Sequence, residues 1–466
     1  MSSLMESSKP SGKSLKNWND NRPFFIDPAL PGFVVSYGQF LEDLNRCVAA
    51  FALPELTLDP PTGRVNGECG TALPKLTLDS PTGRVNGEMA SHFDCYRFLM
   101  GLIAALVDNR DVSLTELAGY SLPSQSLAQL TQLDRTNLLN AEGVAARVRV
   151  SSSRVTLYTS GTTGSAKPIV QSVTNLIRAV QVSCKHETDI WGLTYQPTKV
   201  AALQVILQAI CNGNAIVNLY GLAPSEARNA IDTFEITHLS ATPTYYRLLA
   251  IDPKPIPSVV AVSVGGEVCD ANLQARMESI FPNARFRNIY ASSETGTILQ
   301  STGDCFLVPE SLRNAIRIRD GRLWIHQEHV AENLQHECVD GFWDSGDEVL
   351  IVSDEPLKLK ISGRRSDWIN VGGLKVNPHE VEQLINDVPG VVDARVYGIA
   401  NSVTGHLVAA DVYLAKSAPT SVTQPLDTAS LRRHLSNRLP PHAVPRIVHF
   451  REELPISSSG KKDRHS

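Results

Sequence analysis

From about residue 150 onward, the chain alternates between two patterns of apolar residues. Short runs of β-branched and aliphatic residues, such as RVTLYT and ITHLSA, are typical of strands, whereas longer segments such as ALQVILQAICNG are typical of helices. Strands that alternate with helices of this length predict βαβ units built on a parallel sheet. The expected elements, in chain order, are at 154–159, 173–184, 202–213, 214–220, 236–241, 244–250 and 258–266.

A smaller unit with a different pattern begins after Gly363. One of its predicted helices places Val381, Leu384 and Ile385 on a single face, as a helix that packs against a sheet should do. We therefore expect a small α+β unit and a domain boundary between 362 and 368. Its elements are predicted as helices at 378–387 and 427–439 and strands at 391–399 and 407–414.

The N-terminal part of the chain contains a near-exact duplication. The segment ALPELTLDPPTGRVNGE at 52–68 recurs as ALPKLTLDSPTGRVNGE at 72–88. Two copies are too few for a solenoid, which needs about three repeats to bury a continuous core. We interpret 52–88 as a duplicated surface insertion, and the polar residues 1–22 as a flexible arm.

Composition narrows the class of protein. A net charge of -5 over 466 residues, with no basic cluster, argues against a nucleic-acid partner. The eight cysteines are widely spaced, which predicts reduced thiols and no zinc site. The apolar stretch at 98–107 is too short for a membrane span, and the polar N-terminus lacks the apolar core of a secretory signal, so a cytoplasmic location is expected.

The segment YTSGTTGSAK at 158–167 is the first candidate for chemistry. Glycines let backbone N–H groups turn toward an anion, hydroxyl groups add donors, and Lys167 adds positive charge, so the loop has the parts of a phosphate site. It is not a Walker A loop, because Lys167 is neither preceded by Gly nor followed by Ser or Thr. Taken alone, such a loop is also typical of a solvated linker.

Further motifs follow the loop in a fixed order. They are VGGE at 264–267, YASSE at 290–294, WDSGD at 343–347, SGRRSDWINVGGLKVNPHEVE at 362–382 and LPISSSGKKDR at 454–464. Together with the loop, this series resembles the adenylate-forming superfamily, which contains acyl-CoA synthetases, peptide-synthetase adenylation domains and luciferases. The resemblance covers about two-thirds of the chain.

The resemblance implies an α/β fold with two parts. A large N-terminal domain of packed mixed sheets with helices would be joined by a hinge to a small mobile α+β C-terminal domain. The implied divisions are a 1–22 arm, a 23–361 ATP- and acid-binding domain, a 362–368 hinge and a 369–466 domain that carries the catalytic lysine.

The family's reaction implies a role for each motif. A carboxylate attacks the α-phosphate of ATP, pyrophosphate leaves, and an acyl-adenylate forms. Tyr290 would stack on adenine, Asp347 would accept the ribose hydroxyls, and Arg364 would lie over the same region. The implied catalytic residues are Lys461, Glu294 and Thr162, with Glu294 also holding Mg²⁺. The other implied ATP-binding residues are Thr159, Ser160, Gly161, Thr163, Gly164, Lys167, Gly265, Gly266, Glu267 and Ser293.

The C-terminal unit would rotate about the hinge between two steps of the reaction. Its hinge position is Ser366, where relatives carry Asp or Lys, so either Asp367 serves as the pivot or the rotation is tuned differently. After rotation, Gly372 and Gly373 would line the tunnel for the incoming nucleophile. A further departure is Pro168, which stands where relatives have Gly and lacks a backbone donor.

The acid pocket is expected to be lined by Tyr195, Lys199, Val200, Thr242 and Ala291. Val200 falls where amino-acid-activating relatives keep an aspartate, which disfavours an α-amino acid as substrate. Lys199 could meet a second polar group or a phosphate of the acceptor, or it could be a solvated loop residue. His238 is interpreted as a packing or surface residue.

Three functions remain open from the sequence. The first is an acyl-CoA synthetase or carrier-protein loader that passes the acyl group to a thiol. The second is an amide ligase that passes it to an amine, as in freestanding bacterial ligases of natural-product pathways, the coronafacate ligase group included. The third is a nucleotide-binding protein that no longer catalyses. All three would bind ATP, and the first two need Mg²⁺, a carboxylic acid and either CoA, a carrier protein or an amine.

Overall fold

The computed structural model describes residues 22–29, 34–52, 89–114, 140–160, 166–414, 426–452 and 462. The arm expected at 1–22 and the duplication at 52–88 lie outside these ranges, apart from Arg22 and Ala52.

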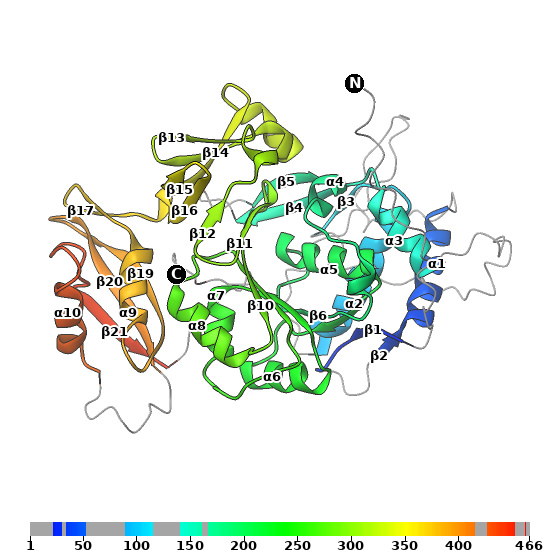
Figure 1. Ribbon diagram of the computed structural model, residues 1–466, viewed down its shortest axis with the longest axis horizontal. Coiled ribbons are helices and arrows are strands. Elements are labelled where there is room, and N and C mark those ends of the chain that lie inside the picture. The colour runs from blue at the N-terminus through cyan, green and yellow to red at the C-terminus, as the bar shows by residue number, and fades with distance from the viewer. Residues whose placement is uncertain are drawn as a thin grey trace, which may run out of the picture.

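An eight-stranded sheet forms the centre of the larger part (Figure 1). Strands β1, β7, β6, β8, β9 and β10 are parallel neighbours, while β2 and β11 pair antiparallel at the two edges. Because parallel strands end at the same edge, the loops after β6, β8 and β9 lie together there. In sheet order the strands are β11 (Gly296–Ser301), β10 (Arg285–Ser292), β9 (Ala261–Gly265), β8 (His238–Ala241), β6 (Ile190–Leu193), β7 (Ala215–Asn218), β1 (Pro23–Ile26) and β2 (Val34–Ser36).

Helices connect and cover these strands as the sequence pattern predicts for βαβ units. Helix α5 begins at Val200 and ends before Gly213, whose left-handed conformation closes the last turn. Helix α7 is capped by Thr242, whose hydroxyl oxygen accepts a hydrogen bond from the Tyr245 N–H. The helices of this part are α1 (Tyr37–Ala52), α2 (Met89–Val107), α3 (Ala141–Arg149), α4 (Val173–Ile177), α5 (Val200–Asn212), α6 (Pro224–Thr233), α7 (Pro243–Leu249) and α8 (Ala271–Ile280), with the 3-10 turn η4 (Cys184–His186).

Two smaller sheets flank the central one. One is a three-stranded sheet and the other has five strands in the order β12-β16-β15-β14-β13. Their strands are β3 (Val112–Ser113), β4 (Arg154–Ser160), β5 (Ala166–Ser172), β12 (Cys305–Leu307), β13 (Ile316–Arg319), β14 (Arg322–His326), β15 (Phe342–Asp354) and β16 (Leu357–Arg364), with 3-10 turns η5 (Glu310–Leu312), η6 (Gln327–His329) and η7 (Glu332–Glu337).

The C-terminal part has a sheet and a hydrophobic core of its own, and it projects from the side of the larger part (Figure 1). Val381 and Ile385 of one helix and Leu431 and Leu435 of the other pack into this core, as the helical spacing predicts. The molecule is therefore a large α/β part followed by a small α+β part. The elements of the small part are η8 (Arg365–Asp367), β17 (Ile369–Val371), β18 (Leu374–Val376), α9 (Pro378–Asn386), β19 (Val391–Asn401), β20 (Gly405–Leu414), α10 (Thr428–Ser436) and β21 (Ile447–Arg451).

The helix expected at 173–184 is wrong in its length, because α4 ends at Ile177. The guanidinium of Arg178 donates to the carbonyl oxygens of Thr295 and Thr297 at 2.9 and 3.0 Å, so the chain is held there by β11. The β-branched residues Val180 and Val182 that follow have low helix propensity, so they do not favour continuing the helix past Ile177.

The described part of the chain bears on two expectations, that the cysteines are reduced and that no segment spans a membrane. Six of its cysteines, Cys95, Cys184, Cys211, Cys269, Cys305 and Cys338, are free thiols. No helix within the described residues is both long enough and apolar enough to cross a membrane.

Candidate active site

Three of the predicted ATP-binding residues are in direct contact. Asp347 on β15 is 6 % exposed and accepts hydrogen bonds from the Tyr290 hydroxyl at 2.5 Å and from Arg364 Nε at 3.1 Å. Asp347 and Arg364 also face each other across the β15–β16 pair. Burial raises the pKa of Asp347, although the nearby Arg364 opposes this shift. The strand pairing thus assembles an aromatic ring, a carboxylate and a guanidinium at one place.

Glu294 lies close enough to this cluster for its charge to act on both Asp347 and Arg364. Within the described residues its carboxylate makes no hydrogen bond or ion pair. A carboxylate without a partner fits Mg²⁺, which is usually bound through one or two carboxylates together with phosphate oxygens. Ser293, the residue before it, accepts a hydrogen bond on its carbonyl oxygen from Gln171 at 2.9 Å.

The expected phosphate loop joins β4 and β5. Its residues Gly161, Thr162, Thr163 and Gly164 lie outside the described residues, and Ser160 is described only as the end of β4. Thr159 is directly opposite Lys167 in the β4–β5 pair, with its hydroxyl 3.5 Å from the Lys167 carbonyl oxygen. The Lys167 ammonium instead contacts Glu337 of η7 at 2.7 Å.

The proline after Lys167 costs no hydrogen bond in the sheet. The carbonyl oxygen of Pro168 accepts from the Asn333 side chain at 2.8 Å, and Asn333 accepts from the Val170 N–H at 2.9 Å. Since the N–H and C=O groups of one strand residue point the same way, the Pro168 nitrogen also faces away from β4. Proline is tolerated at such an edge position because no ladder bond needs its donor.

The VGGE segment connects the sheet edge to the end of the chain. Gly265 ends β9, and a Cβ there would lie 3.1 Å from the Ile289 carbonyl oxygen, so glycine eases the close approach of β9 and β10. The Glu267 carboxylate accepts hydrogen bonds from the Thr244 N–H and the Lys462 N–H, each at 3.0 Å. Lys461 lies outside the described residues, but its neighbour in the chain is thus bound to the VGGE segment.

A cavity of about 210 Å³ opens beside these groups. All five residues expected in the acid pocket line it, and so do Gly265, Gly266 and Ser293. Burial lowers the pKa of Lys199, the N-cap residue just before α5, and burial raises the pKa of Tyr195. The five expected acid-pocket residues that line the cavity are Tyr195, Lys199, Val200, Thr242 and Ala291.

The wall of the cavity also contains residues that the sequence analysis missed. Among them are Trp191 on β6 and Arg287 on β10. Arg287, Ile289 and Ala291 alternate along β10 and all line the cavity, so a period-two pattern starting at Ala291 would have found Arg287.

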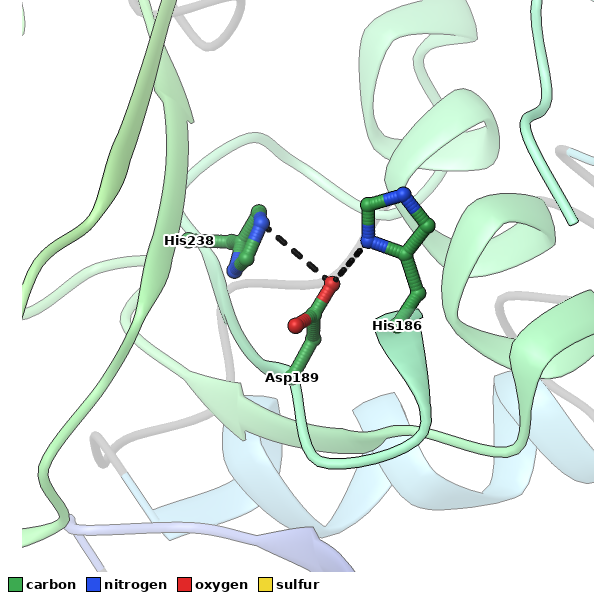
Figure 2. Close-up of side chains that lie close together, drawn as sticks. All are labelled: His186, Asp189 and His238. Carbon is green, nitrogen blue, oxygen red and sulfur yellow. Dashed lines mark hydrogen bonds and ion pairs between the residues drawn. The ribbon is translucent and has the colours of Figure 1, made fainter. Parts of the chain in front are cut away.

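Two histidines and an aspartate form a cluster (Figure 2). Asp189 Oδ2 is 2.8 Å from His186 Nδ1 and 3.3 Å from His238 Nε2, and the His238 ring packs on Trp191 with ring centroids 4.8 Å apart. The ligand atoms of the three residues lie within 4.8 Å of one another, but these mutual contacts explain their closeness without a metal ion. His238 is 8 % exposed, so of the two interpretations, a packing residue or a surface residue, the structure supports packing.

The residues expected to form the hinge and the tunnel are not among those that line the cavity. The Ser366 hydroxyl contacts Asp367 Oδ1 at 3.2 Å within η8, and Asp367 lies 3.8 Å from His379 of α9. Gly372 and Gly373 form the two-residue turn between β17 and β18, and both have the positive φ that such turns require.

Two family models match this chain, one in its larger part and one in its C-terminal part. The AMP-binding enzyme family model matches residues 105–320, and the model of the AMP-binding enzyme C-terminal domain matches residues 380–461. The 2-succinylbenzoate–CoA ligase of Staphylococcus epidermidis is 23% identical over 384 residues, which cover 75% of each chain. Phenyloxazoline synthase of Mycobacterium tuberculosis is 25% identical over 356 residues, which cover 66% of this chain and 24% of that one.

Solved structures share the fold at low identity. ATP-bound MatB from Rhodopseudomonas palustris superposes with a TM-score of 0.64 at 18% identity, covering 96% of this chain and 95% of that one. The amide bond synthetase McbA from Marinactinospora thermotolerans gives a TM-score of 0.61 at 18% identity and covers 95% of each chain. With both family models matched over well over half of the sequence, the chain belongs to the AMP-binding family of adenylate-forming enzymes, a family of AMP-forming ligases.

Proposed function

We propose that this protein activates a carboxylic acid with ATP and then transfers the acyl group to a thiol. In the first step a carboxylate oxygen forms a bond to the α-phosphorus, and the bond to pyrophosphate breaks. In the second step a thiol sulfur attacks the acyl carbon, and AMP leaves with the bonding electron pair. CoA and the pantetheine thiol of a carrier protein are the two acceptors of this kind.

One observation carries the proposal most directly. Tyr290 and Ala291 are consecutive residues of β10, and the first contacts Asp347 whereas the second lines the cavity. A nucleotide held by the Tyr290 cluster would therefore have its phosphates next to an acid held in the cavity. Bringing two reactants together in this way supplies much of the rate enhancement in such reactions.

The individual roles follow from charge and shape. Tyr290 would pack on adenine beside Gly265, Gly266 and Glu267, since a flat purine needs flat walls. Asp347 would accept the ribose hydroxyls, with Arg364 alongside. The phosphates would be held by the loop residues Thr159, Ser160, Gly161, Thr162, Thr163 and Gly164, with Lys167 and Ser293.

Charge neutralisation would come from two sides. Glu294 would hold Mg²⁺, which supplies positive charge to the phosphates when it is bound. Lys461 would bridge the substrate carboxylate and the α-phosphate, where negative charge develops. The contact of Lys462 with Glu267 supports this role, because it holds the end of the chain at the VGGE segment.

The second step would require the C-terminal part to rotate. Ser366 and Asp367 would form the pivot, and Gly372 and Gly373 would then line the path of the incoming thiol. The Gly372–Gly373 turn is exposed in this structure, so it is available to form a new surface.

The test is exchange of labelled pyrophosphate into ATP that depends on an added carboxylic acid. We expect exchange for the wild type with one class of acid, and its loss in Lys461→Ala. Lys358→Ala is the matched control, because Lys358 is an exposed lysine on β16. No exchange with a broad panel of acids, alongside intact ATP binding, would overturn the proposal and favour a binding protein.

A second assay decides the acceptor. The acyl-adenylate is formed with the accepted acid, and CoA, phosphopantetheine or a primary amine is then added at equal concentration. Faster release of AMP with either thiol supports the proposal. Faster release with the amine alone would make the protein an amide ligase instead.

A further inference from the structure

The cavity beside the nucleotide residues is lined by positive charge without any negative charge. Among the described residues that line it, two are cationic, Lys199 and Arg287, and none is an aspartate or glutamate. Arg287 makes no hydrogen bond or ion pair with any residue in the described part of the chain. Arg287 lines the cavity with an exposed side chain that has no internal ion pair in the described part, so it can bind an anionic ligand without first breaking such a pair.

Arg287 sits in a particular place in the sheet. It is in register with Ser263 on β9, and Ser263 is in register with Ser240 on β8. All three line the cavity, so a row of two small hydroxyl residues leads to the guanidinium. Two small side chains leave space over the strands, and a large residue at either position would fill it.

This row lies away from the end where ATP would react. Along β10, Arg287 and Ala291 are four residues apart, which corresponds to about 13 Å at the usual rise of a strand. Ala291 adjoins Tyr290 and so marks the nucleotide end of the cavity, whereas Arg287 marks the far end. An acid that reaches both ends needs several bonds between its two terminal groups.

The far end also offers an unused donor. Trp191 lines the cavity, and its indole N–H is buried without a hydrogen-bond partner in the described part of the structure. Buried donors are nearly always paired in folded proteins, so an unpaired one indicates a missing acceptor. A ligand oxygen could be that acceptor. The Trp191 ring packs on His238, which is itself held by Asp189 in the cluster of Figure 2.

We propose that the acid bound in this cavity carries a second carboxylate at the end away from the reacting one, and that Arg287 binds this distal carboxylate. The inference rests on the proposed function, because that function identifies the cavity as the acid site. Arginine is suited to the task because its planar fork can donate two parallel hydrogen bonds to one carboxylate. The substrate class is thus a dicarboxylic acid with a spacer of several bonds, aliphatic or aromatic.

The test compares matched pairs of acids in the pyrophosphate exchange assay. Each pair shares a chain length, for example suberic acid with octanoic acid and pimelic acid with heptanoic acid. We expect the wild type to use the diacid with the higher kcat/KM. Arg287→Ala should raise KM for the diacid about tenfold or more, as loss of a charged hydrogen bond predicts, and leave the monoacid unchanged.

Two more variants make the result specific. Arg287→Glu should lower diacid use further than Arg287→Ala, because it adds repulsion. Arg285→Ala is the matched control, since Arg285 is exposed like Arg287 and lies two residues earlier on the same strand, but does not line the cavity. Equal use of both acids by the wild type, or equal losses on both in Arg287→Ala, would overturn the proposal.

A binding measurement separates this inference from the proposed function. The midpoint of thermal unfolding is recorded with and without diacid, in the absence of ATP. If no acid supports exchange but diacids stabilise the wild type and not Arg287→Ala, the proposed function fails and the anion site stands. If diacids neither bind nor react, the anion site is overturned.

Discussion

Asp393 of the C-terminal part lies 3.6 Å from Arg247 of the large part, and both side chains are buried. The same carboxylate contacts the Lys462 ammonium at 2.8 Å through its other oxygen. Lys462 also lies 3.4 Å from Glu382. A single buried carboxylate thus joins the two parts of the molecule and the end of the chain next to Lys461.

Replacing Asp393 with Asn should therefore weaken the docking of the C-terminal part. Removing one partner of a buried ion pair typically costs about 3–5 kcal/mol when the remaining charge is left without a partner. Here Arg247 keeps its contact with Asp270 and Lys462 keeps its contact with Glu382, so we expect Asp393→Asn to lower the free energy of unfolding by less than that amount in denaturant titration, and to slow pyrophosphate exchange. The matched control is Asp387→Asn, which alters an exposed contact to Asn272 across the same boundary. Equal losses in the two variants would contradict this account.

Lys167 and Glu337 form an ion pair in which the side chains are 50% and 38% exposed. The hydrogen bond from Lys167 lowers the pKa of Glu337. If Lys167 binds ATP phosphates, it must leave this partner. Glu337→Gln should then lower KM for ATP about two- to fivefold, since an exposed pair is worth up to about 1 kcal/mol. Lys167→Ala should raise KM for ATP about tenfold.

A second exposed ion pair between a lysine and a carboxylate serves as the control for this prediction. Lys360 contacts Asp304 at 2.8 Å, with side chains 41% and 47% exposed. Asp304→Asn should leave KM for ATP unchanged. A rise in KM in Glu337→Gln would mean that the carboxylate itself helps to bind ATP.

Asp347 should make the protein less stable at neutral pH than an uncharged residue in its place. Burial raises its folded-state pKa above the unfolded value, so the folded state holds its proton more tightly. The stability linked to that proton is fully present below the unfolded pKa and is lost as pH rises through the folded pKa. Asp347→Asn should unfold at a higher temperature than the wild type at pH 7, with the difference shrinking toward pH 4. The same variant should lose ATP-dependent exchange, and a lower midpoint at pH 7 would contradict the argument.

The sequence predicts the ends of helices better than it predicts contacts between distant residues. The ends of α5 and α7 follow from nearby signals, a glycine at 213 and a threonine cap at 242. The sequence motifs predict that Tyr290 and Asp347 act on the same nucleotide, but not that their side chains touch. That contact depends on how the sheets that contain β10 and β15 pack in the folded chain. The Arg247–Asp393 pair had no sequence signal, since each residue reads as an ordinary charged side chain.

His238 should make folding sensitive to acid. Burial lowers its pKa, and His186 and Arg287 lower it further, while Asp189 acts in the opposite direction. The unfolded chain then binds the proton more readily, so stability is complete above the unfolded pKa of about 6.5 and is lost as pH falls below it. We expect the unfolding midpoint to drop between pH 7.5 and pH 5.5, and to drop less in His238→Asn. An equal drop in the variant would assign the effect to other groups.

Gly363 lies near the end of β16, just before the segment that leads into the C-terminal part. Its φ is +122°, and a Cβ added there would lie 2.6 Å from Cδ2 of His379. Gly363→Ala should therefore cost about 1–3 kcal/mol of stability from backbone strain, and more if His379 cannot move away. Gly303→Ala is the control, because no atom lies within 4 Å of its added Cβ.

If the C-terminal part rotates about this segment, Gly363→Ala should also affect the two half-reactions differently. Pyrophosphate exchange reports the arrangement in which Lys462 contacts Glu267, and AMP release on addition of thiol reports the rotated one. His379 belongs to α9 of the C-terminal part, so strain against it should change the balance between the two arrangements. We expect the ratio of the two rates to change at least several-fold in Gly363→Ala and to stay constant in Gly303→Ala. Equal losses in both half-reactions would mean that Gly363 serves the fold alone.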